Sequence, residues 1–378
     1  MSAPLPPRRI LVVSHACAAP LNQRLYAELA DQAGWQVTLL VPRRWRSEYG
    51  ERRARRDPYY QGALELVPVL GSGNIPLRAY LADWGALFRR ARPDLLYVHH
   101  EAYGVATLQA FLAARRARVP AAFYSAQNLL KSYPPPFRQA EAWVYRQAAL
   151  ALPVSASVAE VLRAKGYRGA LEVLPLAVDL RLYCPTASQE RESGPLHLGY
   201  GGRLVPEKGV DVLLQALTLL QDAVLWVVGS GPEEAALRKL AAQLGLGDRV
   251  HFVGAVPQDA VPSWMRRFDL LVLPSRSLPS WSEQFGRVLI EALACGVPVI
   301  GSSAGEIPHL IAATGGGLTF PEGDASALAA RAEELRAPLE RAALSSAGLA
   351  SVRRDYSQEV VASRLALALE EAIRRGSA

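Results

Sequence analysis

The stretch from Leu273 to Ile307 reads LPSRSLPSWSEQFGRVLIEALACGVPVIGSSAGEI and decides the fold class. It begins at the end of an apolar segment, Leu270–Leu273, which predicts a buried strand that stops at a proline. After a Ser/Pro-rich loop, apolar side chains recur at helical spacing from about Phe285, and Gly296 ends this predicted helix. A second apolar segment, Val297–Ile300, predicts another buried strand. A strand–helix–strand unit of this kind is typical of a parallel sheet covered by helices.

Two carboxylates, Glu283 and Glu291, stand eight positions apart in this stretch. Glu283 is predicted in the loop at the mouth of the helix, and Glu291 about two turns inside it. Taken singly, each could be a structural or solvated helix charge, as most helix carboxylates are. However, Glu291 precedes the small residues Ala-Leu-Ala-Cys-Gly, which suit close packing on a sheet, so a half-buried carboxylate there needs a partner. We therefore expect both carboxylates to face a ligand held against the amides of Gln284, Phe285 and Gly286, where the helix dipole is positive.

The rest of the chain shows the same alternation of strands and helices in two halves. The first half predicts strands near 8–14, 35–41, 64–70, 95–98, 121–125, 150–154 and 171–174, and helices near 21–33, 77–90, 103–116, 137–147 and 157–165. The second half adds strands near 196–201, 223–228 and 250–253, helices near 210–220, 233–244 and 259–268, and a tail that is helical throughout from 325 to 375. The stretch 175–179 and the polar stretch 185–195 have the composition of a linker. Two doubly wound halves predict a cleft lined by the carboxyl ends of both sheets.

A second motif, GGRLVPEKG at 201–209, follows a predicted strand and opens a helix. Gly202 lets a ligand approach the backbone, while Arg203 and Lys208 place two cations at the mouth of the turn. This arrangement suits a diphosphate, although surface cations on an ordinary turn are the alternative. The Gly-Lys-Ser/Thr ending of a Walker A loop is missing from the motif, which disfavours phosphoryl transfer from ATP.

The combination of Glu283, Phe285-Gly286, Glu291-Ala292 and Gly296–Ile300 resembles the Glu-x₇-Glu signature of retaining family-4 glycosyltransferases. The resemblance implies the GT-B fold, in which two doubly wound, Rossmann-like α/β domains face a central cleft and a C-terminal helix crosses back to the first domain. We expect an acceptor-binding domain at 1–183, a nucleotide-sugar-binding domain at 195–354 and the returning helix at 355–378. The implied activity is retaining transfer of a sugar from a UDP-, GDP- or ADP-sugar to a hydroxyl of a glycan, a lipid-linked acceptor or a small molecule. No cofactor and no metal ion are implied, because Arg203 and Lys208 supply two cations.

The resemblance also assigns roles in the second half. Glu291 is expected to bind the ribose hydroxyls of the donor, and Glu283 the transferred sugar. The remaining donor-binding positions that it implies are Gly202, Arg203, Lys208, Gly229, Val253, Gln284, Phe285 and Gly286. Arg203 and Lys208 would meet the diphosphate, whose leaving-group charge the reaction must stabilise.

The first half departs from the family pattern. Residues from His15 to Asn22 stand where many members carry a Gly-rich loop, and Gln127 stands near the position of a common catalytic-site His, followed by Asn128. These four residues are candidates for the acceptor side. A Gln side chain hydrogen-bonds to a sugar hydroxyl but does not act as a base, so that role does not carry over directly.

His100 and Glu101 end another predicted strand and resemble a family segment that faces the acceptor. We expect one of them to orient or deprotonate the acceptor hydroxyl. For the histidine, a hydrogen-bonded strand end without catalytic role is the alternative.

Composition narrows the partners and the compartment. The 378 residues suit two domains, no run of apolar residues is long enough to span a membrane, and the first nine residues lead straight into a strand, unlike a signal peptide. Cys17, Cys184 and Cys295 are scattered, which favours the cytoplasm. Residues 1–180 carry a net charge of +10 and residues 181–378 one of −3. The arginine clusters at 43–46 and 52–56 therefore favour peripheral contact with an anionic membrane over nucleic acid, with solvated loops as the alternative.

Two other functions fit parts of the pattern. A nucleotide-sugar epimerase can share this fold, but the Glu-x₇-Glu pattern argues against it. A catalytically inactive nucleotide-sugar-binding protein is the non-enzymatic alternative, and Gln127 is its only support. The sequence does not identify the sugar, the base, the acceptor or the linkage.

Overall fold

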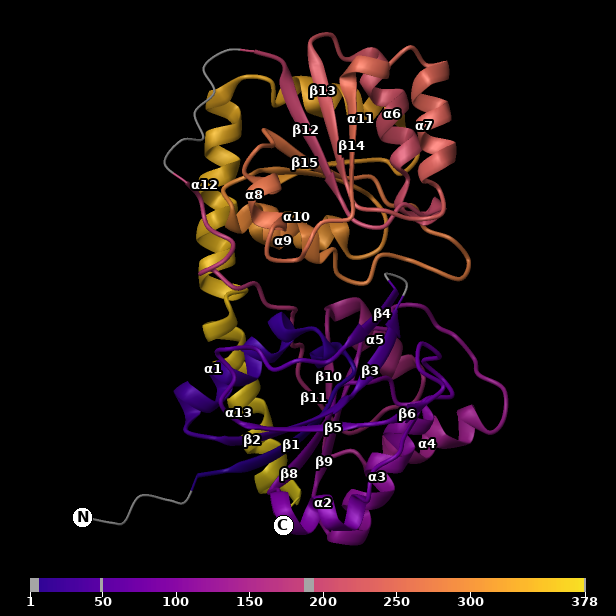
Figure 1. The fold of residues 1–378 in the computed structure, drawn as a ribbon, viewed down its shortest axis with the longest axis vertical. Helices are drawn as coiled ribbons and strands as arrows, with labels where there is room; N and C mark the ends of the chain where they lie inside the picture. Colours follow the sequence, from indigo (N-terminus) through magenta and orange to yellow (C-terminus); the bar gives the residue numbers. More distant parts are fainter. Residues whose placement is uncertain (1–6, 48–49, 187–193, 377–378) are drawn as a thin grey trace, which may run out of the picture. The chain divides into compact units, whose positions relative to one another are not determined.

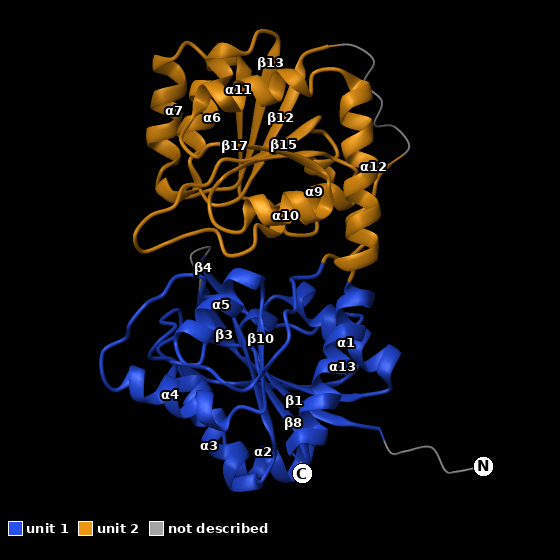
Figure 2. Cartoon of the chain, turned by 180° about the vertical axis from the view of Figure 1, so that it is seen from behind, with its two compact units in different colours: residues 1–177, 358–378 blue, residues 178–357 orange. Residues whose placement is uncertain are grey.

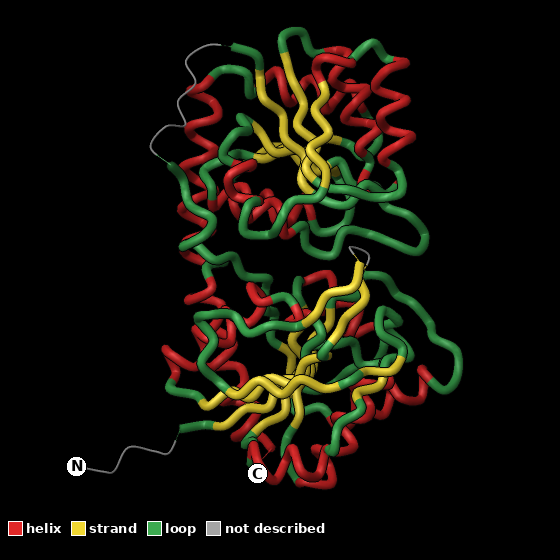
Figure 3. The backbone as a smooth tube through the Cα atoms, viewed as in Figure 1, coloured by secondary structure: helices red, strands yellow, loops and turns green. Residues whose placement is uncertain are grey.

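A computed structural model describes residues 7–47, 50–186 and 194–376. The chain forms two compact units: residues 1–177 together with 358–378, and residues 178–357 (Figure 2). Much of the predicted linker at 185–195 lies outside the described residues, as do the first six residues. Each unit is a parallel sheet with helices on both faces, so the predicted α/β fold of two doubly wound domains is confirmed (Figure 3).

Unit 1 contains a seven-stranded sheet in the order β11-β10-β9-β8-β1-β2-β5, and every pairing in it is parallel. Its strands are β1 (Arg9–Val13), β2 (Gln36–Pro42), β5 (Ala63–Val67), β8 (Leu95–Val98), β9 (Ala121–Ser125), β10 (Leu150–Pro153) and β11 (Ala170–Leu171). Two antiparallel hairpins lie outside this sheet: β3 (Arg44–Ser47) with β4 (Gly50–Arg53), and β6 (Val69–Leu70) with β7 (Ala79–Tyr80). Because β1 pairs with both β2 and β8, the chain reverses its direction of travel across the sheet between β1 and β8.

Helices cover both faces of the unit 1 sheet (Figure 1). On one face, α1 (Arg24–Ala33) packs against α13 (Gln358–Gly376) over the apolar side chains of β1 and β2. On the other face lie α2 (Trp84–Ala91), α3 (Val105–Ala117) and α4 (Phe137–Gln147), while α5 (Ala156–Ala164) follows β10. The predicted return of the C-terminal helix to the first half is therefore confirmed by α13.

Unit 2 contains a six-stranded parallel sheet in the order β14-β13-β12-β15-β16-β17. Its strands are β12 (Leu196–Gly201), β13 (Ala223–Val228), β14 (Val250–Gly254), β15 (Leu270–Leu273), β16 (Val299–Ser302) and β17 (Gly317–Phe320). One face packs on α6 (Val210–Leu219), α7 (Glu234–Gln243) and α11 (Ala325–Glu334); the other elements are α8 (Val261–Met265), α9 (Arg287–Ala294), α10 (Ile307–Thr314) and α12 (Pro338–Asp355). The apolar core beneath α6 explains why that helix is buried along most of its length.

Several predicted elements were wrong in extent or type, each for a local reason. The helix predicted near 77–90 begins only at Trp84, because the Asp83 carboxylate caps it by accepting from Ala86 N at 2.8 Å, and residues 79–80 form β7 instead. The tail is not helical throughout: Pro338 starts a new helix after α11, and α13 begins separately at Gln358.

Other differences concern strands and loops. The strand predicted at 297–300 is shifted to β16, since Pro298 has no N–H to donate to the sheet. The strand predicted at 171–174 is only the two-residue β11, and the helix predicted at 259–268 is the shorter α8. The segment between β2 and β5, which carries the arginine clusters at 43–46 and 52–56, contains the β3–β4 hairpin, and the sequence pattern did not predict this hairpin. No helix in the described parts of the chain combines the length and the hydropathy needed to cross a membrane.

Candidate functional site

The candidate site in unit 2 lies where the chain reverses across the sheet. Strand β12 pairs with β13 on one side and with β15 on the other, so the carboxyl ends of β12 and β15 mark a topological switch point. Open parallel sheets bind ligands in the crevice outside such strand ends. Both predicted motifs start here, since the 201–209 turn follows β12 and the loop that carries Glu283 follows β15.

The structure brings Glu283 and Lys208 together although they are 75 residues apart in the chain. Lys208 Nζ lies 2.6 Å from Glu283 Oε2, and the hydroxyl of Ser275 donates to the same oxygen at 3.1 Å. Both side chains are largely buried, with 16% of Lys208 and 11% of Glu283 exposed. Lys208 Nζ also lies 5.0 Å from the centre of the Trp281 ring, a cation–π contact. A charge-assisted pair in this environment is stronger than one in water.

Backbone contacts hold the Glu283 loop in place. The amide of Glu306 donates to the Glu283 carbonyl at 3.0 Å, which ties the loop after β15 to the turn after β16. Gly305 in that turn has a φ of +55°, and a Cβ atom there would lie 2.3 Å from the Glu283 carbonyl oxygen. The turn therefore needs glycine both for its backbone angle and for the close approach.

The glycine turns after β12 and β13 also touch backbone to backbone. Gly229 has a φ of +144°, and a Cβ atom on it would lie 1.8 Å from the carbonyl oxygen of Gly202. The amide of Gly202 in turn donates to the carbonyl of Val228 at 3.0 Å. Arg203 begins the loop that follows, where its guanidinium lies 4.0 Å from the carboxylate of Glu207. The two predicted nucleotide-pocket turns are thus neighbours at the same sheet edge.

Glu291 has its own set of partners on α9. Its carboxylate is buried, with 12% of the side chain exposed. Arg287, one turn earlier, forms an ion pair with it: Arg287 Nε lies 3.1 Å from Glu291 Oε1, but the two atoms are not aligned for a hydrogen bond. The Tyr183 hydroxyl hydrogen-bonds to this carboxylate. Burial raises the pKa of the Glu291 carboxyl, while Arg287 and Tyr183 act in the opposite direction. A carboxylate held by two side chains in this way keeps a defined orientation.

The other predicted donor-side residues surround the start of α9 or lie on β14. The helix begins at Arg287 rather than near Phe285, so the three amides of the predicted cradle belong to the loop before it. Gln284 is exposed, whereas Phe285 is buried and lies 6.2 Å from the Tyr356 ring, centre to centre. Val253 lies on β14, half-buried.

In unit 1, Glu101 and Gln127 lie in the loops after the neighbouring strands β8 and β9. Glu101 accepts hydrogen bonds from Ala126 N at 2.7 Å and from the Ser125 hydroxyl at 2.8 Å. Burial raises the pKa of the Glu101 carboxyl, and these two hydrogen bonds oppose that rise. The Gln127 amide donates to the Tyr133 hydroxyl at 3.2 Å. The loop ends of β8 and β9 are therefore joined through the Glu101 side chain.

Asn22 and Asn128 lie in loops of unit 1, and His15 and His100 lie together at its switch point. The amide of Asn22 donates to the Ala16 carbonyl at 2.8 Å, which closes the turn after β1, and Asn128 is half-buried. His15 and His100 each stand two residues after a strand end, of β1 and β8 respectively, and their Nδ1 atoms lie 3.0 Å apart. Burial and then the nearby Arg78 guanidinium lower the pKa of both imidazoles, so both are neutral.

Sequence reasoning missed four residues that shape these sites. Ser275 and Trp281 stand in the quoted stretch, but no spacing rule distinguishes them from its other polar and aromatic residues. Tyr183 lies at the end of the predicted first domain, between the two predicted linker stretches, and its contact with α9 has no local signal. Arg78 falls within the helix predicted near 77–90, but in the structure it precedes that helix. Asp83 is a favourable N-cap residue and is the signal in the sequence for the later helix start.

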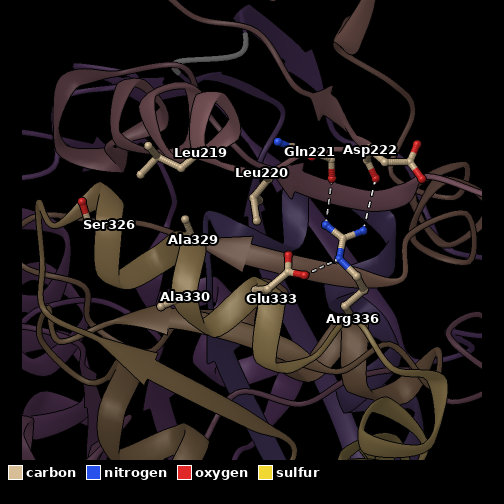
Figure 4. A pocket seen from close by; sticks show the side chains of 9 residues that line it. All are labelled: Leu219, Leu220, Gln221, Asp222, Ser326, Ala329, Ala330, Glu333 and Arg336. Carbon is tan, nitrogen blue, oxygen red and sulfur yellow. Dashed lines mark hydrogen bonds and ion pairs between the residues drawn. The ribbon is translucent and has the colours of Figure 1, made fainter.

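A separate hollow of about 560 Å³ in unit 2 contains none of the predicted site residues (Figure 4). It runs along α11 to the segment that precedes β13, and Arg336 bridges Glu333 and the carbonyls of Gln221 and Asp222 at its edge. Among the described residues, no cluster of three His, Cys, Asp or Glu side chains is placed to hold a metal ion.

Comparisons with known proteins find glycosyltransferase families in both halves of the chain. Residues 186–344 match the family described as "Glycosyl transferases group 1", and residues 18–182 match "Glycosyltransferase Family 4". A 2-deoxystreptamine N-acetyl-D-glucosaminyltransferase from Streptomyces fradiae is 31% identical over 354 residues, which cover 84% of this chain and 82% of that protein. A 2-deoxystreptamine glucosyltransferase from Streptomyces kanamyceticus is 31% identical over 297 residues, 70% of this chain and 75% of its own length.

Solved structures share the fold. The structure of Anabaena HepE in complex with UDP has a TM-score of 0.74 with 20% identity, over 96% of this chain and 99% of that one. These relatives give no support to the epimerase or to the binding-only alternative. With matches to the family in both halves and a relative of this identity and coverage, the chain belongs to the family 4 glycosyltransferases and is a glycosyltransferase with the GT-B fold.

Proposed function

We propose that this glycosyltransferase takes a sugar from a nucleotide-diphosphate sugar, with UDP, GDP or ADP as the carrier, and transfers it with retention to a hydroxyl. The observation that carries the proposal is the buried pair of Lys208 and Glu283 at the switch point of unit 2. A lysine has three N–H donors, so Lys208 can keep its bond to Glu283 Oε2 and still donate to phosphate oxygens. In this pair, Lys208 thus offers a cation to the diphosphate and Glu283 offers a carboxylate to the sugar beside it.

The leaving diphosphate is the group whose charge increases most during transfer. Fixed cations aimed at that charge lower the barrier, because they need no rearrangement at the moment of reaction. In the proposed mechanism Arg203 and Lys208 supply these cations, and Ser275 keeps Glu283 oriented toward the sugar. Two such cations are the reason to expect transfer without a divalent metal ion.

The donor's ribose is assigned to Glu291. A carboxylate has two acceptor oxygens, and ribose offers two neighbouring hydroxyl donors. Arg287 and Tyr183 hold the carboxylate from the protein side, which supports a fixed orientation for such a contact. The amides of Gln284, Phe285 and Gly286 remain the predicted partners of the sugar hydroxyls, and the backbone near Val253 that of the base.

On the acceptor side, we assign orientation of the acceptor hydroxyl to the loops after β8 and β9. Glu101 has both oxygens engaged with Ala126 and Ser125, and His100 is bonded through both ring nitrogens, to His15 and to Tyr80. Roles for His100, Glu101 and Gln127 stay predictions. Single substitutions to Ala, His100→Ala and Glu101→Ala, test them through the KM for the acceptor.

A donor panel tests the proposal directly. Full-length protein is mixed with UDP-, GDP- and ADP-linked glucose and N-acetylglucosamine, and the melting temperature is recorded, because a ligand that binds only the folded state raises it. Hydrolysis and transfer are then measured separately with the donor that binds, in buffer with and without EDTA. NMR of the product's anomeric proton reports retention or inversion. No response to any nucleotide sugar, an inverted anomer, or loss of activity in EDTA would each contradict one part of the proposal.

We also propose peripheral contact between unit 1 and an anionic lipid surface. The β3–β4 hairpin carries the exposed arginines Arg44, Arg46, Arg52 and Arg53. Arg46 N donates to Ser72 Oγ at 2.8 Å, so the hairpin adjoins a segment with four exposed apolar side chains, Leu70, Ile75, Leu77 and Leu81. Arginines attract anionic headgroups, and exposed leucines enter the interface, which together favour a membrane surface over solvent.

Vesicle sedimentation tests this contact. Binding to vesicles with phosphatidylglycerol should exceed binding to phosphatidylcholine alone and should decrease as salt is added. The double variant R44E/R52E should lose most of the binding, whereas R115E/R116E on α3 makes the same charge change elsewhere in unit 1 and serves as its control. Equal loss in both variants would show that net charge alone is responsible and would reject the hairpin as the contact.

A further inference from the structure

The Arg78 guanidinium of unit 1 is buried without hydrogen-bond partners for two of its nitrogens. Only 2% of the residue is exposed, and neither Nε nor Nη1 reaches an acceptor. Within the described parts of the chain, no carboxylate lies at ion-pair distance from it. Burial of a charge without a partner is costly, so proteins seldom keep one unless something binds it.

Other side chains position this guanidinium. Its Cζ atom lies over the Trp45 ring, 5.3 Å from the ring centre, and the Trp45 ring is also 4.6 Å from the His15 ring, centre to centre. The acid whose charge reaches Arg78 is Glu101, which is already bonded to Ala126 and Ser125. The surroundings therefore position the guanidinium but, among the described residues, leave it without an ion-pair partner in contact.

The neighbouring histidines add a donor. His15 Nδ1 and His100 Nδ1 lie 3.0 Å apart, and His100 Nε2 lies 3.0 Å from the Tyr80 hydroxyl. Both rings are neutral, so each carries one N–H. If His100 donates to His15, the spare N–H is on His15 Nε2; if His15 donates to His100, the spare O–H is on Tyr80. In either arrangement the chain of three groups keeps one hydrogen to offer to a ligand.

The cluster lies where a doubly wound sheet binds ligands. His15 follows β1 and His100 follows β8, the two strands of the unit 1 switch point, and Arg78 immediately precedes β7. We propose that Arg78, together with the His15–His100–Tyr80 chain, forms a subsite for an oxyanion, a phosphate or carboxylate group on the acceptor. This assignment of an acidic acceptor rests on the proposed function; the existence of the anion site does not.

Anion binding is tested on the full-length protein with inorganic phosphate and, separately, with acetate, at constant ionic strength against chloride. The melting temperature of the wild-type protein should rise saturably with one of the two, because the anion binds only the folded state. The anion that acts identifies the chemistry, phosphate or carboxylate. Arg78→Met should remove the response, and Arg116→Met, at an exposed position on α3, should keep it. A response to neither anion, or an equal response in Arg78→Met, would overturn the proposal.

A second variant covers the case in which Arg78→Met does not fold. Arg78→Lys keeps the charge but loses the planar donor fork, so the midpoint for the anion should move to about tenfold higher concentration. An unchanged midpoint would mean that the anion binds elsewhere, which also refutes the site.

A separate experiment tests whether the anion that Arg78 binds belongs to the acceptor. The anion titration is repeated in saturating UDP: an unchanged response places the anion apart from the nucleotide, whereas loss of the response assigns the site to the donor diphosphate and overturns the acidic acceptor. Transfer to a sugar phosphate or a uronic acid is then compared with transfer to the neutral sugar. Arg78→Met should raise KM for the acidic acceptor at least tenfold and leave that for the neutral sugar within twofold. Failure of every nucleotide sugar to bind would count against the proposed function, while the phosphate and acetate results would still decide the anion site.

Discussion

Removal of the Lys208 charge should destabilise unit 2 even before any substrate is present. In Lys208→Met, the Glu283 carboxylate keeps the Ser275 hydroxyl but loses the ammonium 2.6 Å from Oε2. Breaking a buried ion pair by removing one partner costs about 3–5 kcal/mol, since the other charge stays in a poorly solvated place. The remaining hydrogen bond puts the expected loss at the lower end, about 3 kcal/mol, which for a domain of this size lowers the melting temperature by about 6–12 °C.

A double-mutant cycle measures this pair. Glu283→Gln keeps the shape and the acceptor for Ser275 but removes the charge, so the double variant K208M/E283Q should regain about 2 kcal/mol relative to K208M alone. Urea unfolding of the full-length protein gives the free energies, and Lys239→Met, at an exposed position on α7, controls for the loss of any lysine. A K208M protein within about 0.5 kcal/mol of wild type, or a double variant no more stable than K208M, would refute the reasoning.

Three further predictions concern the same unit. Arg203→Ala should weaken UDP binding by about 2 kcal/mol, roughly thirtyfold, if its charged hydrogen bonds reach the diphosphate, and unchanged affinity by calorimetry would remove it from that role. Burial raises the pKa of Glu291 above its ordinary value of 4.5, so the folded protein binds the proton more tightly than the unfolded chain, and this residue's contribution to stability falls as pH rises above about 4.5. Glu291→Gln removes that titration, so its stability relative to wild type should increase with pH above this value; a flat difference in urea midpoints would contradict the sign. Gly229→Ala should lower the free energy of unfolding by about 3 kcal/mol or more, because its Cβ would lie 1.8 Å from the Gly202 carbonyl oxygen. Gly245 also has a positive φ but open space around it, so Gly245→Ala should cost only about 1 kcal/mol when both variants are compared by thermal melts.

The fold could be predicted from the sequence where apolar periodicity and the position of turn residues agree. Strands β12, β13 and β15 were predicted with their observed limits. Strands β13 and β15 are unbroken apolar runs, β12 alternates apolar residues with a histidine and two glycines, and turn residues bound all three. The failures lie where tertiary contacts decide. The two-residue strand β7 has no pattern of its own, and the β3–β4 hairpin consists mostly of charged residues that are exposed.

The candidate site was readable in part. From the sequence, Glu283 and Lys208 were each expected to contact the donor, and in the structure their side chains lie next to each other. The sequence pattern did not predict the hydroxyl group that contacts each of the two carboxylates, Glu283 and Glu291. Ser275 reaches Glu283 only because the loop after β15 folds back, and Tyr183 reaches Glu291 from a segment more than a hundred residues earlier.

The return of α13 to unit 1 has a consequence for the order of synthesis. Seven buried residues of α13 belong to the apolar core of unit 1, which is otherwise built from the first 177 residues: Val361, Ala362, Leu365, Ala368, Leu369, Ala372 and Ile373. Residues 178–357, by contrast, form one continuous piece with a core of its own. The half that leaves the ribosome first must therefore wait for the last helix before its α1 face is covered, and the half that leaves second can fold before it. A chain that ends prematurely near residue 357 would carry a finished unit 2 and an open apolar face on unit 1, which makes the truncated product a target for chaperones and proteases.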